Sequence, residues 1–115
     1  MTTSRTIHQT QAMIDRYGRL NGDNDIIHYD PDYARRRGFR GTLNHGLMTL
    51  GYVAEVGAQR WGRDWFYGGE LTLKWTDPVC PGDDLAVSAD EDGAVTCEVQ
   101  TGLVAEGRIG VSGDE

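Results

Sequence analysis

The longest stretch without a charged side chain lies between Arg40 and Glu55, and it constrains the fold more than any other part of the chain. The segment NHGLMTLGYVAEVGAQRW, residues 44–61, places a mostly small, uncharged stripe at helical spacing. That stripe consists of Leu47, Leu50, Gly51, Ala54, Gly57, Ala58 and Trp61. The segment also contains three glycines, Gly46, Gly51 and Gly57. Because each glycine lowers helix stability by about 1 kcal/mol, we predict a largely buried helix whose backbone packs closely against a curved sheet.

Strand patterns follow this helix. ELTLKWT, residues 70–76, alternates apolar and polar side chains, which is the period of a half-buried strand. DLAVSAD, AVTCEVQT and LVAEGRIGV predict three more strands, and EDG between the first two of these is typical of a hairpin turn. Because helices precede consecutive antiparallel strands, we predict an α+β domain.

The amino-terminal part carries its own helix signals. Residues 5–8 form a short strand pattern, and a helix pattern follows Thr10 and ends near Gly22. The segment DPDYARRRG begins with Asp30 as a cap and a proline at the first helical position, and Gly38 ends it. We therefore predict two helices before the central one.

Composition excludes several classes. The chain has 115 residues, which fits a single domain over residues 1–115, and its net charge of −7 argues against non-specific nucleic-acid binding. Neither a signal-peptide core nor an apolar run of about 20 residues is present, so a cytoplasmic location is expected. Cys80 and Cys97 lack the spacing of a zinc site or redox motif, and we expect them to be buried and reduced.

The candidate site begins with Asp23 and His28, five positions apart. A helix would turn these side chains about 140° apart, and a strand would place them on opposite faces. They can meet only if the chain curls between them, and residues 22–25 are turn formers. The spacing predicts a site built on a loop.

Several short motifs carry a resemblance to a known family. They are GDNDIIH at 22–28, DP at 30–31, YA at 33–34, GF at 38–39 and HG at 45–46. Together they resemble the MaoC-like dehydratase family, which includes the (R)-specific enoyl-CoA hydratases. The later DPVCPGDDLAV resembles the family's strand–turn–strand segment. The resemblance implies a hot-dog fold, an antiparallel sheet wrapped around one long helix, and a homodimer.

The same resemblance implies a hydro-lyase reaction at the 2,3-position of an acyl thioester. Asp23 is then the base, and His28 orients the water and shares its proton. The backbone N–H of Gly46 binds the developing enolate oxygen if Asn44 caps the central helix. No metal and no cofactor are implied, because coenzyme A or phosphopantetheine arrives as part of the substrate.

Two residues depart from the family pattern. Asp25 stands where the family has asparagine, and Ile26 stands where it has proline. A second carboxylate near Asp23 is expected to raise the pKa of one of the pair by repulsion. Asp25 is alternatively a substrate-binding group of a specialised biosynthetic dehydratase or isomerase, or a sign of a non-catalytic binding protein.

An arginine run follows the loop, at Arg35, Arg36, Arg37 and Arg40. Cations near a helix carboxyl end interact favourably with its dipole, which is the simpler reading. Alternatively, Arg36 and Arg37 dock the phosphates of coenzyme A or an acidic acyl-carrier protein.

Other readings stay open. Asp23 and His28 could be ordinary loop residues, and His45 is more often structural than catalytic at a helix start. A metal site from His28, His45 and a carboxylate lacks a recognised ligand spacing. A hot-dog thioesterase would need a carboxylate on the central helix, and Glu55 lies too far along it.

The aromatic residues that follow the central helix also allow more than one role. They are Trp61, Trp65, Phe66 and Tyr67. They fit a core cluster, a dimer contact or an acyl-pocket lining.

Overall fold

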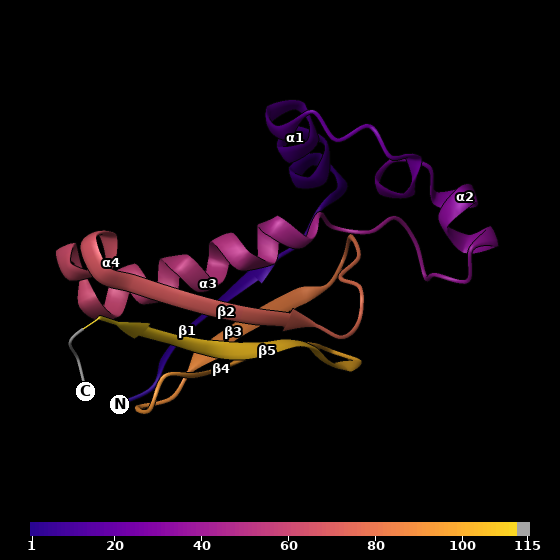
Figure 1. Cartoon of the computed structure of the whole chain (residues 1–115). Coiled ribbons are helices and arrows are strands. Elements are labelled where there is room, and N and C mark those ends of the chain that lie inside the picture. Colours follow the sequence, from indigo (N-terminus) through magenta and orange to yellow (C-terminus); the bar gives the residue numbers. More distant parts are fainter. Residues whose placement is uncertain (113–115) are drawn as a thin grey trace.

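A computed structural model gives the structure of the chain, and it describes residues 1–112. One antiparallel sheet of five strands packs against a long helix, with strand order β1-β3-β4-β5-β2 (Figure 1). The strands are β1 (Thr3–His8), β2 (Gly69–Trp75), β3 (Asp84–Ala89), β4 (Ala94–Val99) and β5 (Gly102–Val111). The predicted α+β class and all five predicted strands are confirmed.

Alternation along the strands builds the core. In β3, Leu85, Val87 and Ala89 are buried while their neighbours Asp84 and Ala86 are exposed, as the period of two requires. The predicted turn between β3 and β4 is present, with Gly93 at a φ of 89°, a left-handed conformation that favours glycine. These buried side chains form one cluster with the inward side of α3.

The central helix α3 (Gly46–Trp61) lies along the sheet, but its buried face is not the predicted one. The buried residues are Met48, Thr49, Val53, Val56 and Gly57. Only Gly57 belongs to the predicted stripe, and Leu47 is 53% exposed. Val53 and Val56 face the sheet and belong to the core cluster, and Trp61 is the stripe residue that packs against it. The prediction of a largely buried helix was wrong for this chain by itself.

Two of the three glycines in α3 do permit close packing. A Cβ on Gly57 would lie 2.6 Å from the Trp65 ring, and one on Gly46 would lie 3.3 Å from Trp75. Gly51 has no such neighbour within 4 Å. Gly46 and Gly57 thus make room for tryptophan rings at the two ends of the helix, and they do not serve close packing against the sheet backbone.

The remaining helices are α1 (Gln11–Asn21), η1 (Ile26–His28, a 3₁₀ helix), α2 (Pro31–Arg36) and α4 (Arg63–Gly68). The predicted boundaries of α1 hold, since Thr10 caps its start and Gly22 ends it at a φ of 75°. Asp30 caps α2 by accepting hydrogen bonds from the N–H groups of residues 32 and 33. Helices α1 and α2 gather at the amino end of α3, whereas α4 lies at its far end (Figure 1).

Helix α4 was not predicted, and it places the aromatic residues. Trp61 and Trp65 stack at 5.8 Å between ring centroids and pack against the core, while Phe66 and Tyr67 are exposed. Fifteen residues of helix separate Trp61 from Gly46, about 22 Å at 1.5 Å per residue. Within one chain this cluster therefore does not line a pocket at the amino end of α3.

An ion pair with a buried carboxylate ties the segment between α2 and α3 to the turn before β3. Arg40 donates to both carboxylate oxygens of Asp83 at 3.1 and 2.9 Å, and Asp83 is 1% exposed. Gln100 and the backbone N–H of Cys80 also donate to this carboxylate. Burial raises the pKa of Asp83, but these hydrogen bonds outweigh it and leave the pKa lowered. Arg40 is thus a structural residue and differs from the rest of the arginine run.

Cys80 and Cys97 are both buried and unpaired, as predicted. Among residues 1–112, the helices are too short or too polar for any of them to cross a membrane.

Candidate active site

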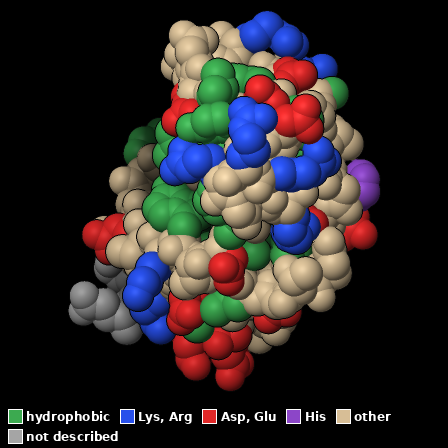
Figure 2. All heavy atoms as spheres, turned by 90° about the vertical axis from the view of Figure 1, so that its right-hand side faces the viewer, with side chains coloured by type: hydrophobic (Ala, Val, Ile, Leu, Met, Phe, Trp, Pro, Cys, Tyr) green, Lys and Arg blue, Asp and Glu red, His purple; other side chains and the backbone are tan. Residues whose placement is uncertain are grey.

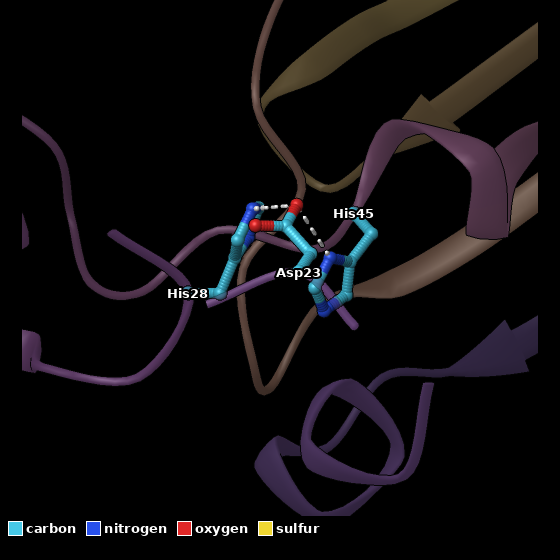
Figure 3. A group of neighbouring side chains, drawn as sticks. All are labelled: Asp23, His28 and His45. Atoms are coloured by element: carbon cyan, nitrogen blue, oxygen red, sulfur yellow. Dashed lines mark ion pairs between the residues drawn. The ribbon is translucent and has the colours of Figure 1, made fainter. Parts of the chain in front are cut away.

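Three side chains from two separate segments converge at the amino end of α3 (Figure 3). Asp23 and His28 come from the loop after α1, and His45 is the residue that precedes α3. Asp23 Oδ2 lies 3.3 Å from His28 Nε2 and 3.5 Å from His45 Nδ1. The predicted meeting of Asp23 and His28 on a loop is confirmed.

Side-chain hydrogen bonds to the backbone curl this loop. Asn21 accepts from the N–H of Asp23, Asp23 Oδ1 accepts from the N–H of Asp25, and Asp25 Oδ1 accepts from the N–H of Ile27, each at 3.0 Å. Such turns reverse the chain without a helix or strand. The loop then enters η1, which presents His28 toward Asp23.

Tyr29 ties the loop to α1. Its hydroxyl donates to the carbonyl oxygen of Asp23 at 2.5 Å. Gly18 of α1 makes room for that hydroxyl, because a Cβ on Gly18 would lie 1.9 Å from it. The position of Asp23 therefore depends on a glycine in the preceding helix.

Backbone carbonyls fix the tautomers of both histidines. His28 Nδ1 lies 2.8 Å from Leu43 O, and His45 Nε2 lies 3.2 Å from Ile14 O. A carbonyl only accepts, so each of these nitrogens carries its hydrogen. In the neutral rings, the nitrogens that face Asp23 are then lone-pair acceptors.

The carboxylate of Asp23 is kept ionised. The N–H of Asp25 lowers the pKa of Asp23 most, burial opposes this, and the nearby rings of His28 and His45 lower it further. Repulsion from Asp25 was expected to raise a pKa in this pair, but for Asp23 the direction is opposite. The reason is that the Asp25 carboxylate turns away to cap η1 while its backbone N–H faces Asp23.

The three side chains differ in their exposure to solvent. The side chain of Asp23 is 38% exposed, that of His28 is 12% exposed, and that of His45 is 3% exposed. A ligand from solvent therefore reaches Asp23 and His28 first, with His45 behind them.

The start of α3 differs from the prediction in one residue. The cap is His45, which makes no side-chain cap hydrogen bond, and not Asn44. The Asn44 amide instead donates to Gln9, within a buried polar pair. The first-turn N–H groups of α3, Gly46 included, have no partner four residues back along the helix.

A cavity of about 330 Å³ opens at this helix end. One wall is formed by residues 43–46 and Thr49, and the other by residues 75–79. Trp75 covers Gly46, and its ring N–H donates to the Gly46 carbonyl at 3.1 Å. Gly46 thus lies in a cavity next to the Asp23–His28–His45 cluster.

The cluster has the donor types of a metal site, since its three ligand atoms lie within 4.8 Å of one another. The rings of His28 and His45 stack at 4.0 Å with 27° between their planes. The same three groups can also hold a water or share a proton.

The other predicted site residues lie outside this cluster. Arg36 is the last residue of α2 and Arg37 follows it, and both are exposed. Their Cζ atoms lie 5.9 and 5.6 Å from the centroid of the Tyr33 ring. Basic side chains gather on the end of the molecule that carries α1 and α2 (Figure 2). Glu55, considered for a thioesterase, forms an ion pair with Arg5.

His45 is the member that sequence reasoning considered for catalysis or a metal site but judged to be more often structural. Its position between a buried asparagine and the first residue of α3 gives no sign of where its ring points. Only the fold brings it to Asp23.

Comparisons with known proteins agree with this geometry. The model of the family described as "MaoC like domain" matches residues 1–111. A Drosophila melanogaster protein named peroxisomal multifunctional enzyme type 2 is 32% identical over 113 residues, covering 97% of this chain and 18% of its own length. A Rhodospirillum rubrum protein named (R)-specific enoyl-CoA hydratase is 26% identical, covering 94% of this chain and 81% of its own.

A solved structure shares the fold. The unliganded R-hydratase PhaJ1 from Pseudomonas aeruginosa superposes with a TM-score of 0.77 at 23% identity, covering 95% of this chain and 77% of that one. The match to such hydratases confirms the predicted hot-dog fold. The chain spans between 8% and 18% of the length of the peroxisomal multifunctional relatives that it matches.

Proposed function

Because the chain belongs to the MaoC-like domain family, we propose that it is a hydro-lyase that adds water to, or removes it from, the 2,3-position of an acyl thioester. The observation that carries this proposal is the 3.3 Å approach of Asp23 Oδ2 to His28 Nε2 on a loop at the amino end of α3. The Rhodospirillum rubrum relative, named (R)-specific enoyl-CoA hydratase, supports the reaction class.

In the proposed hydration, one water lies between Asp23 and His28. Asp23 is ionised and His28 presents a lone pair, so both can accept a proton from that water. As the water oxygen bonds to C3 of the enoyl thioester, one of its protons passes to this pair. The electron pair of the double bond moves toward the thioester oxygen, and the Asp23–His28 pair then delivers that proton to C2 as the enolate collapses. Dehydration follows the same steps in reverse.

The charge that develops on the thioester oxygen needs a donor. We assign this role to the Gly46 N–H, which lies in the first turn of α3 and next to the cavity. The positive end of the helix dipole adds to it. Asn44 lines the same cavity, but its amide group donates to Gln9. We therefore propose that Asn44 contacts the substrate only as part of the cavity wall.

The carrier portion of the substrate is proposed to meet Arg36 and Arg37. Both are exposed cations at the end of the molecule that carries the site, which suits the phosphates of coenzyme A or an acidic acyl-carrier protein. Replacing both by alanine is expected to raise KM with little change in kcat. An unchanged KM would assign them to the α2 helix end alone.

We also propose a homodimer. Apart from Gly57, the apolar stripe of α3 that the sequence predicted to be buried is exposed or half-buried in the single chain, with Leu47 53% exposed. A second copy would cover it. Sedimentation analysis at micromolar concentration tests this, and a monomer would refute it. A cytoplasmic location is likewise a proposal, and several relatives are named as peroxisomal.

The test of the reaction is hydration of crotonyl-CoA, followed by loss of enoyl-thioester absorbance. Wild type is compared with Asp23→Asn, which keeps the side-chain shape and an oxygen for the N–H of Asp25 but removes the charge. Activity that falls at least about 100-fold in the variant supports the reaction and the base together. An inactive wild type that is folded and dimeric would refute enoyl-CoA as the substrate class.

The second candidate function is a specialised dehydratase or isomerase of a non-CoA substrate, and Asp25 is the feature that favours it. Asp25→Asn tests the charge alone, because asparagine retains an oxygen to cap η1. A gain in crotonyl-CoA hydration in this variant would identify Asp25 as a specificity residue. Unchanged or lower activity would count against that role. A non-catalytic binding protein would be inactive in both forms.

A further inference from the structure

His45 is a buried titratable group for which the proposed reaction has no role. Its ring is 3% exposed, and its Nδ1 is a buried nitrogen with no hydrogen bond of ordinary geometry within residues 1–112. That nitrogen lies 3.5 Å from Asp23 Oδ2, on the side of the carboxylate away from solvent. Buried polar atoms are rarely left without a partner, so this one needs an explanation.

The oxygens around the two histidine rings limit how many protons the cluster can hold. Each ring has an oxygen at both nitrogens: a backbone carbonyl at one, and Asp23 Oδ2 at the other. With both rings neutral, the carboxylate oxygen faces two lone pairs and receives no hydrogen. One added proton on either ring satisfies Asp23 Oδ2, whereas two would place like charges on rings stacked at 4.0 Å. The cluster is therefore built for one shared proton.

We propose that His45 is a positioning residue that shares this proton with Asp23 and thereby holds the carboxylate in place, leaving the lone pair of His28 for the water. The inference rests on the proposed hydro-lyase function and adds a residue to it. His45 is the suitable holder of the proton because its buried Nδ1 has no other hydrogen-bond partner, whereas His28 lies nearer to solvent and can meet the water.

The other titratable groups around His45 do not compete for this role. Tyr17 of α1 lies 5.2 Å from its ring and Tyr29 lies 6.1 Å away, between centroids. The Tyr29 hydroxyl is engaged with the Asp23 carbonyl, and burial raises its pKa. Asp23 is thus the titratable group that His45 Nδ1 faces.

Two substitutions separate positioning from a merely structural role. In His45→Asn, the short amide reaches the place of Nδ1 and can donate to Asp23 Oδ2. In His45→Gln, the longer amide reaches the place of Nε2 and can donate to Ile14 O. His8→Asn is the matched control, because His8 is exposed and pairs with Asp84 outside the site.

Crotonyl-CoA hydration is measured for the three variants across pH, with thermal unfolding as the check on folding. We expect His45→Gln to lose about 10- to 100-fold in kcat with little change in KM. We expect His45→Asn to retain most of kcat and His8→Asn to match wild type. Wild-type kcat in His45→Gln, or an equal loss in both position-45 variants, would overturn the proposal.

A second measurement does not depend on activity. Nitrogen-detected NMR spectra of the imidazole rings are recorded for wild type and Asp23→Asn. The proposal requires the His45 Nδ1 signal to shift in the variant while the His8 signals stay unchanged, and an unmoved His45 signal would overturn it. If the wild-type protein is inactive but this shift is seen, the reaction assignment fails while the shared proton stands.

Discussion

Replacing Gly18 by alanine should weaken the loop that carries Asp23, although alanine is the better helix former. Gly18 lies in α1, is buried, and faces Tyr29. An alanine Cβ would lie 1.9 Å from the Tyr29 hydroxyl and 2.9 Å from ring carbon Cζ, both well inside contact distance. The ring must move, and its hydrogen bond to the Asp23 carbonyl is then lost.

The size of the effect follows from three terms. Alanine gains about 1 kcal/mol over glycine in a helix. Overpacking costs about 1–3 kcal/mol, and loss of the hydroxyl hydrogen bond costs about 0.5–1.5 kcal/mol. Gly18→Ala should therefore lower the free energy of unfolding by roughly 1–3 kcal/mol, and it should lower kcat because Asp23 is no longer held.

The assay is a double-mutant cycle by urea unfolding, with Gly18→Ala, Tyr29→Phe and both together. Tyr29→Phe deletes the atom that the new Cβ meets first, so the double variant should be more stable than the sum of the single changes predicts, by about 1–2 kcal/mol. Gly41→Ala is the control, because a Cβ there meets nothing within 4 Å and Gly41 is not among the glycines with positive φ. Additive effects at Gly18 and Tyr29 would refute the reasoning.

Three further predictions concern stability and reactivity. Arg40→Ala should lower the free energy of unfolding in urea by about 2–3 kcal/mol, because it leaves the buried Asp83 carboxylate with fewer partners; a change below about 0.5 kcal/mol would contradict a structural role. Since the pKa of Asp83 is lowered in the folded state, its contribution is present above the ordinary value of 3.8 and is lost as pH falls through the folded-state pKa. As pH is lowered below 4, the free energy of unfolding should thus fall less steeply in Asp83→Asn than in wild type. Equal slopes would contradict this contribution of Asp83. Burial raises the pKa of the Cys97 thiol to about 11, so neither Cys97 nor the buried Cys80 should react with a thiol reagent at pH 8 until urea unfolds the chain; fast reaction of the native protein would show that these thiols are accessible.

Local signals in the sequence were sufficient for the strands and for the bounds of α1 and the start of α2. Thr10, Gly22 and Asp30 act through their own backbone and the next few residues, so their caps appear where the sequence places them. Strand alternation depends only on a period of two, and the strands were accordingly predicted correctly. The curl between Asp23 and His28 was predictable for the same reason, because hydrogen bonds two residues apart produce it.

The orientation of α3 was not predictable from its pattern. Its apolar residues surround more than one side of the helix, so the pattern does not say which side meets the sheet, and the fold buries Val53 and Val56. Most of the stripe that the sequence predicts to be buried lies on the surface of the single chain, where we propose that a second copy packs.

The sequence by itself determined the α+β class, the order of the elements and the Asp23–His28 loop, since all of these depend on interactions between residues close in the chain. Only the tertiary structure decided that His45 joins Asp23, that Asp25 faces away to cap η1, and that Gly18 of α1 makes room for Tyr29. Those contacts depend on how α1, the loop and α3 pack together, and the spacing of residues along the chain carries no information about that packing.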